Sequence, residues 1–222
     1  FEFKHGATMC NVLLADEINR TSPKTQSALL QIMEEYKVTV DGATYDLPDP
    51  FMVIATQNPV GSIGTQKLPE SQMDRFMIRL SMGYPDNDAE CKMLLNRSDK
   101  NPLNSVNCIV SKNEFLEMQS EVQNVFVSDD MARHIVSLIS ATRKHPLLSR
   151  GASPRATLSL TDMAKAVAFA EGRDYIVPRD VQNIFICAVN HRVILNAKAS
   201  ASKKNSEEIL HEILRKTPKP RT

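Results

Sequence analysis

Residues 12–19, VLLADEIN, place four apolar residues directly before the adjacent carboxylates of Asp16 and Glu17. The apolar run predicts a buried strand, and its carboxyl end is where open α/β sheets bind their ligands. Nucleotide hydrolases use such a pair: one carboxylate helps to hold Mg²⁺ through its water shell, and its neighbour positions or deprotonates the attacking water. A core strand that simply reaches solvent would give the same pattern.

A second apolar run, residues 51–56, ends at Gln57, Asn58 and Pro59. We expect this strand to deliver a polar side chain to the same edge of the sheet. An asparagine amide at that edge can donate to a γ-phosphate and accept from the lytic water. The alternative is that Asn58-Pro59 only opens a turn.

A third segment, residues 68–76, predicts a short helix or turn that leads into a strand over residues 76–80. Arg75 lies at the junction. An arginine exposed there could reach across a subunit boundary and stabilise charge on a transferring phosphoryl group, an effect of about 10³ to 10⁵ in rate. The alternative is a local salt bridge with Asp74 or Glu70, worth roughly 0–1 kcal/mol at a surface.

Together with PKTQSALL at residues 23–30, these motifs resemble the MoxR family of AAA+ ATPases, and the resemblance covers essentially the whole chain. It implies that Asp16 and Glu17 are the Walker B pair. Glu17 would be the catalytic carboxylate, and Asp16 would hold Mg²⁺ through water. Asn58 would be sensor 1.

The resemblance also assigns two arginines. Arg75 matches the arginine finger, and Arg155, within GASPRA at residues 151–156, matches sensor 2. The expected catalytic residues are therefore Glu17, Asn58 and Arg75. The residues expected to bind ATP are Asp16, Glu17, Asn58 and Arg155.

The sequence lacks a Gly-x-x-x-x-Gly-Lys-Ser/Thr motif, the P-loop, among its 7 glycines. The resemblance places this Walker A region and the first strand of the sheet upstream of residue 1. We therefore expect the chain to be the C-terminal part of a longer protein and to be inactive alone. The family's strand order would leave a gap between the strands over residues 51–56 and 76–80.

Residues 37–47 alternate around Asp41-Gly42, a strong hairpin signal. They resemble the hairpin that precedes sensor 1 in the branch of AAA+ motors shared with magnesium chelatase and the MCM helicase. Phe1–Lys4 resembles the closing strand of that branch's insertion in the second helix. A plain surface ribbon is the alternative for both segments.

The chain changes character near residue 85, where helical periodicity replaces strand patterns. The expected fold is α/β: residues 1–85 are the C-terminal part of an AAA+ nucleotide-binding domain with a parallel sheet, and residues 86–222 are an all-α lid. The sequence predicts lid helices over residues 88–97, 111–124, 128–144, 154–172, 179–195 and 206–215, with N-caps at Ser111 and Ser153.

The composition excludes several classes of function. A net charge of +1, from 27 basic and 26 acidic residues, gives no electrostatic footprint for nucleic acid. The longest apolar run falls short of the roughly 18 residues that a membrane span needs. The 4 cysteines lack the spacing of a zinc site or a disulfide framework. We expect buried thiols in the reducing cytoplasm.

Two functions of different classes follow. The first is an ATP-driven motor that forms a ring, expected to be a hexamer. By resemblance, it would remodel or mature partner proteins in a chaperone-like way, including partners with a von Willebrand factor A domain. The second is a non-enzymatic adaptor or assembly module.

Overall fold

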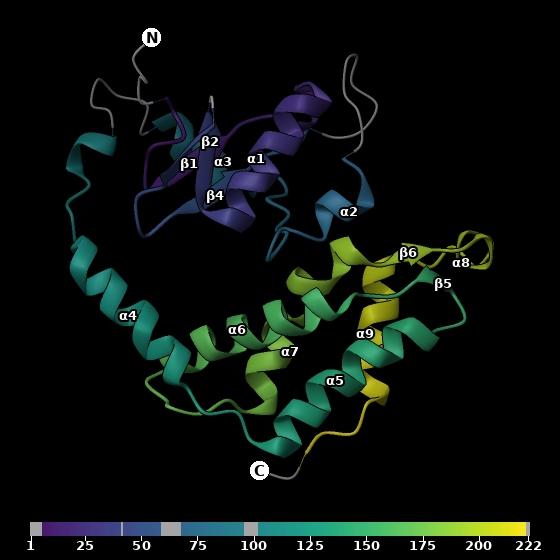
Figure 1. The fold of residues 1–222 in the computed structure, drawn as a ribbon. Helices are drawn as coiled ribbons and strands as arrows, with labels where there is room; N and C mark the ends of the chain where they lie inside the picture. Colours follow the sequence, from purple (N-terminus) through teal and green to yellow (C-terminus); the bar gives the residue numbers. More distant parts are fainter. Residues whose placement is uncertain (1–5, 41, 59–67, 96–101, 221–222) are drawn as a thin grey trace.

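The computed structural model describes residues 6–40, 42–58, 68–95 and 102–220. An α/β part lies at the top of Figure 1, and a bundle of helices lies below it. This arrangement matches the expected fold class, an α/β core followed by a helical lid. The expected domain boundary between residues 85 and 86 stays a prediction.

The α/β part contains two strands that pair in parallel and a separate hairpin. Its elements are β1 (Val12–Ala15), η1 (Ile18–Arg20), α1 (Pro23–Glu35), β2 (Lys37–Val40), β3 (Ala43–Asp46), β4 (Met52–Ala55) and α2 (Glu70–Met73).

Strands β1 and β4 lie side by side, in register from Val12 opposite Met52 to Ala15 opposite Ala55. Their parallel pairing brings the residues that follow both strands to one edge, as predicted from the two apolar runs. The Ser22 hydroxyl caps α1 by accepting from the backbone N–H of Thr25 at 3.2 Å. This cap starts the helix directly after the predicted carboxylate pair.

The predicted hairpin is confirmed, because β2 and β3 pair in antiparallel register from Lys37 opposite Asp46 to Val40 opposite Ala43. Gly42, in the connection, has a φ of 81°, which glycine adopts without the strain that a Cβ would cause. The expected strand at Phe1–Lys4 falls outside the described residues.

The predicted strand over residues 76–80 is wrong. This segment has an irregular backbone, and the Arg79 N–H donates to the carbonyl of Cys187 in the helical bundle at 2.9 Å. Among the described residues no strand lies beside it to complete a ladder. The segment is therefore held by the lid and does not extend the sheet of β1 and β4.

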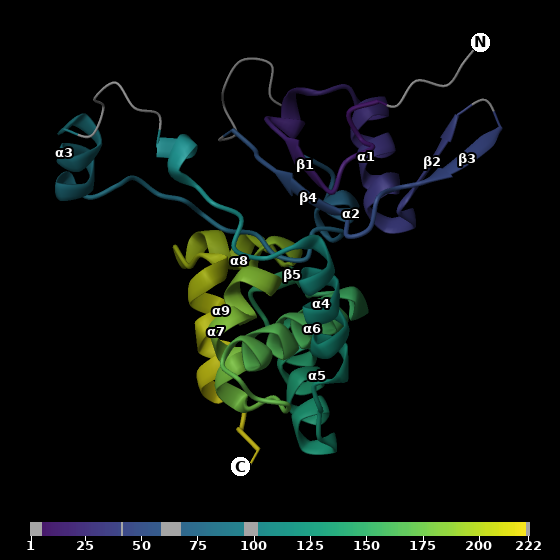
Figure 2. The same ribbon diagram turned by 90° about the vertical axis from the view of Figure 1, so that its left-hand side faces the viewer.

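Most predicted lid helices are present, the expected cap at Ser111 is formed, and Ser128 also caps its helix. The elements are α3 (Asn87–Leu95), η2 (Pro102–Ser105), α4 (Lys112–Asn124), α5 (Asp129–Lys144), β5 (Leu148–Arg150), α6 (Pro154–Ala170), α7 (Pro178–Val189), η3 (Asn190–Arg192), β6 (Ile194–Leu195), α8 (Ala197–Ala201) and α9 (Ser206–Lys216). In Figure 2, α3 stands apart from the bundle, and none of its residues is buried.

One hydrophobic core joins α5, α6, α7 and α9, and its largest fully buried side chain is Phe185. Ile209, Leu210 and Ile213 insert from α9, so this terminal helix docks on the bundle. The 4 cysteines were expected to be buried, but Cys10 and Cys187 are half-buried and Cys91 and Cys108 are exposed. They lie outside this core.

The sequence predicted that the helix beginning near Arg179 continues to residue 195, but α7 ends at Val189. A short turn, η3, follows, and β6 then pairs with β5 in antiparallel fashion. Tertiary contacts of η3, described below, replace the last helical turns. No helix in the described part of the chain is long and apolar enough to cross a bilayer.

We predict that the bundle depends on Asp180, which is fully buried at 0% exposure. Its carboxylate accepts from two Arg173 nitrogens, at 2.6 and 2.9 Å, and from the Val177 N–H at 2.8 Å. The hydrogen bonds from Arg173 to Asp180, the largest cause, raise the pKa of Arg173 above its ordinary value. Asp180→Asn breaks a buried pair, and should lower the free energy of unfolding by about 3 kcal/mol in urea titrations.

Asp174→Asn is the matched control, because Asp174 is exposed in the same loop region. It should change the free energy of unfolding by less than about 0.5 kcal/mol. Equal unfolding midpoints for the two variants would contradict the structural role of Asp180.

Candidate functional site

Glu17 has a backbone conformation that is rare for a residue with a side chain. It follows β1 directly, and its φ of 49° and ψ of 46° lie in the left-handed region. Such a conformation costs about 1–3 kcal/mol and persists only when neighbouring groups hold it. Thr56 does so from the end of β4: its Oγ1 accepts from the Glu17 N–H at 2.8 Å, and its carbonyl accepts from the Ile18 N–H at 3.0 Å.

The structure brings the predicted Glu17 and Asn58 together. The Asn58 amide Nδ2 donates to one carboxylate oxygen of Glu17 at 2.5 Å, and Arg20 donates to the other at 2.6 Å. Asn58 is itself fixed by Asn19, which is 2% exposed. The Asn58 N–H donates to Asn19 Oδ1 at 3.2 Å, and Asn19 Nδ2 donates to the Asn58 carbonyl at 3.1 Å. Asn58 therefore does more than open a turn.

Asp16 presents its carboxylate to solvent beside this pair. It accepts from the Thr56 hydroxyl at 2.5 Å, so Thr56 contacts both predicted carboxylate residues. Mg²⁺ prefers oxygen ligands and keeps several waters, so an exposed carboxylate beside a hydroxyl fits a metal held mainly through water. Within the described ranges, no group of three or more His, Cys, Asp and Glu side chains forms a metal cage.

The two predicted arginines lie together at a different place. Arg75 and Arg155 both pair with the carboxylate of Glu34, at 3.0 and 2.5 Å. Glu34 is in the last turn of α1, whereas Glu17 precedes the start of that helix. From Pro23 to Glu34 the helix rises about 17 Å at 1.5 Å per residue, and the described partners of the Glu17 carboxylate are Arg20 and Asn58. The structure therefore does not bring these arginines to Glu17 of the same chain.

The salt bridges considered for Arg75 do not form. Glu70 pairs instead with Arg150 at 3.0 Å, and Asp74 pairs with Arg192 at 3.3 Å. Arg75 pairs instead with Glu34, a residue to which no role was assigned from the sequence.

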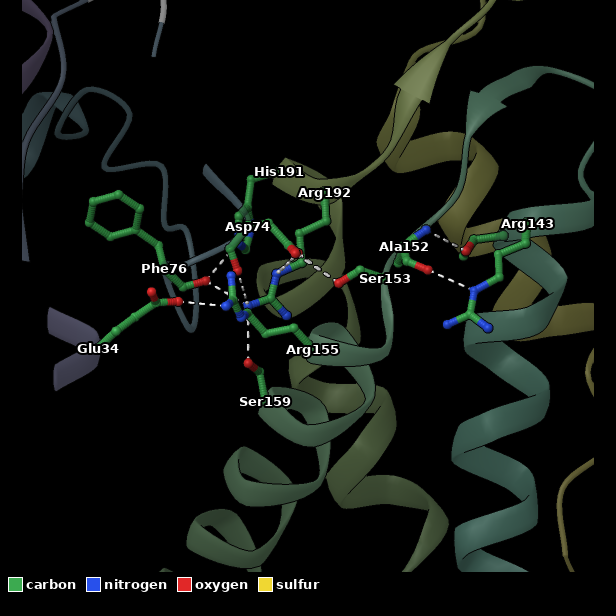
Figure 3. A network of polar contacts seen from close by, with 11 residues as sticks. Glu34, Asp74, Phe76, Arg143, Ala152, Ser153, Arg155, Ser159, His191 and Arg192 are labelled. Atoms are coloured by element: carbon green, nitrogen blue, oxygen red, sulfur yellow. Dashed lines mark hydrogen bonds and ion pairs between the residues drawn. The ribbon is translucent and has the colours of Figure 1, made fainter. Parts of the chain in front are cut away.

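Arg192 ties the segment that carries Arg75 to the lid (Figure 3). Its side chain is only 1% exposed. One guanidinium nitrogen donates to the carbonyls of Asp74 and Phe76, at 3.1 and 2.8 Å, and to the Ser159 hydroxyl at 3.0 Å. Burial, the largest cause, lowers the pKa of Arg192 from its ordinary value.

His191 contacts the same carbonyl, because its Nε2 donates to the Phe76 oxygen at 2.9 Å. Burial lowers the pKa of His191 to about 4, so the imidazole is neutral at physiological pH. No role was assigned to this histidine from the sequence. His191 makes this contact from η3, which begins directly after α7 ends at Val189.

Arg155 is positioned by residues 151–153, the segment that leads into α6. A Cβ on Gly151 would lie 2.5 Å from the backbone of Arg143, so only glycine allows this close approach. This segment is fixed by the Arg143 Nε, which donates to the Ala152 carbonyl at 2.8 Å (Figure 3). Ser153 occupies the predicted N-cap position, but its hydroxyl donates to the Asp74 carboxylate at 2.8 and 3.1 Å and makes no capping bond.

Comparison with known families places both parts of the chain. Residues 1–78 match the family described as "ATPase family associated with various cellular activities (AAA)", and residues 140–213 match the AAA lid domain. A crystal structure of a Cytophaga hutchinsonii protein with a provisional ATPase designation superposes with a TM-score of 0.93 and 40% identity. The aligned region covers 99% of this chain and 69% of the chain in that crystal structure.

Curated relatives give the same result. The uncharacterized Bacillus subtilis protein YeaC is 45% identical over 96% of this chain and 67% of its own length. Chaperone MoxR1 of Mycobacterium tuberculosis is 35% identical over 99% of this chain and 60% of its own length. The chain thus spans about three fifths to two thirds of these relatives. By these relationships, and by a fold that joins the two matched parts, the chain belongs to the MoxR-type AAA+ ATPases.

Proposed function

We propose that the full-length protein is a Mg²⁺-dependent ATPase that uses hydrolysis to remodel or mature partner proteins. The observation that carries this proposal is the contact between Glu17 and Asn58 at the carboxyl ends of two parallel strands, with Glu17 held in a left-handed conformation. A strained residue that neighbouring groups hold in place is typical of functional sites. Family membership supports the same reading.

Glu17 would act as the general base. Its carboxylate would take a proton from water as the water oxygen forms a bond to the γ-phosphorus, and the bond from that phosphorus to the ADP oxygen breaks. Both carboxylate oxygens are engaged, by Asn58 and by Arg20. Each oxygen keeps a second lone pair, so the carboxylate can accept a hydrogen bond from the attacking water while both contacts stay in place.

The surrounding groups would orient the reactants. Asn58 would position the water and contact the γ-phosphate, and Thr56 would hold both Asp16 and Glu17 in place. Bound Mg²⁺, near Asp16, would neutralise phosphate charge. Arg75 and Arg155 would contact phosphate oxygens and stabilise the charge that develops on them.

The position of Arg75 favours a ring. Because Arg75 pairs with Glu34 in the last turn of α1 and not with Glu17, which precedes that helix, it would serve the nucleotide of a neighbouring subunit. We propose a hexamer in the cytoplasm that acts on client proteins, including ones with a von Willebrand factor A domain. The chaperone name of the related MoxR1 supports this assignment.

Replacing Glu17 by glutamine should abolish turnover but retain nucleotide binding. We expect the full-length Glu17→Gln variant to lose a factor of about 10² or more in ATP turnover, because the amide cannot accept the proton. Phosphate release and ATP affinity would be measured in parallel. Glu35→Gln, a change at an exposed residue of α1, is the matched control and should keep turnover.

A wild-type protein that neither binds nor hydrolyses ATP would contradict the motor. The non-enzymatic adaptor would then be the better reading.

Thr56→Val should test how the conformation of Glu17 is held. The substitution removes the hydroxyl that accepts from the Glu17 N–H and keeps the side-chain shape. We expect turnover to fall by about 10-fold or more with ATP affinity changed less than about 3-fold. Thr44→Val, on the exposed hairpin, removes a similar hydroxyl and should have no effect. Equal turnover in both variants would contradict the role of Thr56.

Subunit mixing should show where Arg75 acts. Arg75→Ala and Glu17→Gln are each expected to be inactive. In a randomly mixed ring, some interfaces combine an intact Glu17 with an intact Arg75 from the neighbour, so about a quarter of wild-type turnover should return. Turnover that stays at the level of the separate variants would place Arg75 at its own subunit's nucleotide.

A further inference from the structure

Glu34 joins three segments that are distant in the sequence. Its Oε2 pairs with Arg75, which follows α2, at 3.0 Å, and its Oε1 pairs with Arg155 of α6 at 2.5 Å. Figure 3 shows Glu34 extending from α1 toward Arg155. Each carboxylate oxygen thus serves one guanidinium group, and a single side chain fixes the separation of the two arginines.

Local helix stability does not explain the charges of this cluster. Glu34 lies in the last turn of α1, where the macrodipole disfavours a negative charge, and α1 has no basic residue in that turn. Arg155 lies in the first turn of α6, where a positive charge is disfavoured, and α6 has no acidic residue there. Each charge therefore interacts unfavourably with the dipole of its own helix and is compensated by its ion pair with the residue on the other helix.

The cluster also carries an excess of positive charge. One carboxylate faces two guanidinium groups, so the group of Glu34, Arg75 and Arg155 has a net charge of +1. Each arginine binds Glu34 through one terminal nitrogen. In the described part of the chain, its other terminal nitrogen has no hydrogen-bond partner. Their side chains are 31% and 46% exposed, so an anion can reach them.

We propose that Glu34 is a positioning residue for ATP hydrolysis, which presents Arg75 and Arg155 as one unit to the phosphate chain of a nucleotide. This inference rests on the proposed ATPase function. Glu34 contacts no reacting atom and acts only through the two arginines.

The surroundings make the carboxylate hard to replace. Arg192 lies close enough to Arg155 for their charges to repel, and Asp74 is already paired with Arg192. Among the described residues, Arg75 and Arg155 both form their ion pair with Glu34, so neither arginine keeps an ion pair when this carboxylate is removed. Like charges would then drive Arg75 and Arg155 apart. The fork of a guanidinium needs a fixed orientation to bind phosphate in two-point fashion.

The test is steady-state ATP hydrolysis by the full-length protein, comparing wild type with Glu34→Gln. Glutamine keeps the size of the side chain and removes its charge. We expect kcat to fall by about 10-fold or more, with KM for ATP changed less than about 2-fold, because the arginines act as charge develops in the transition state. Glu35→Gln is the matched control: its carboxylate accepts only from Gln31 of its own helix among the described residues, and its kcat should be unchanged.

A double-mutant cycle with Arg155→Ala separates positioning from a general loss of structure. If Glu34 acts through the arginines, the loss of kcat caused by Glu34→Gln should shrink by at least about 3-fold in the Arg155→Ala background. A loss of the same size in both backgrounds would overturn the inference.

The outcomes distinguish this inference from the function on which it rests. An active wild type with an unchanged kcat for Glu34→Gln overturns the positioning role and leaves the ATPase intact. A wild type without turnover overturns both. A selective fall in kcat that depends on Arg155 supports both.

Discussion

The buried guanidinium of Arg192 is the constraint on which the arrangement of the two parts depends. It is held between Asp74 and Ser159, and it binds the backbone carbonyl of Phe76. A buried charge without partners costs several kcal/mol, so the segment that carries Asp74 and Phe76 has to stay against the lid. That segment also carries Arg75, so Arg75 is linked to the lid through its neighbours Asp74 and Phe76 and to α1 through Glu34. Any motion of the lid relative to α1 would act directly on the pairs at Glu34.

Local signals predicted the elements well, and tertiary contacts explain the exceptions. The capping box at Ser111 and the apolar stripe of α5 act within a few residues, so the sequence shows them. The helix expected to reach residue 195 was too long, because His191 and Arg192 leave it to bind Phe76, which lies 115 and 116 residues away in the sequence. The strand expected over residues 76–80 is absent for the same reason. Its backbone partner is Cys187 in the lid.

The candidate site could be predicted where it follows directly from strand ends. Glu17 and Asn58 follow β1 and β4, and the parallel pairing of these strands brings the two side chains into contact. The residues that support them were missed, because Asn19 and Thr56 look like ordinary polar residues after a strand. Glu34 was missed for a different reason: its partners come from two other segments, and only its unfavourable charge at a helix end was visible beforehand.

The left-handed backbone at Glu17 lowers the stability of the fold, whereas the proposed chemistry requires a carboxylate at this position. Glycine would relieve the strain completely, and asparagine enters this region more readily than glutamate does. Both changes would remove the group that Asn58 contacts. Random substitution under selection for folding alone would therefore replace this glutamate early. In a lineage that had given up hydrolysis, we would expect position 17 to be among the first to drift.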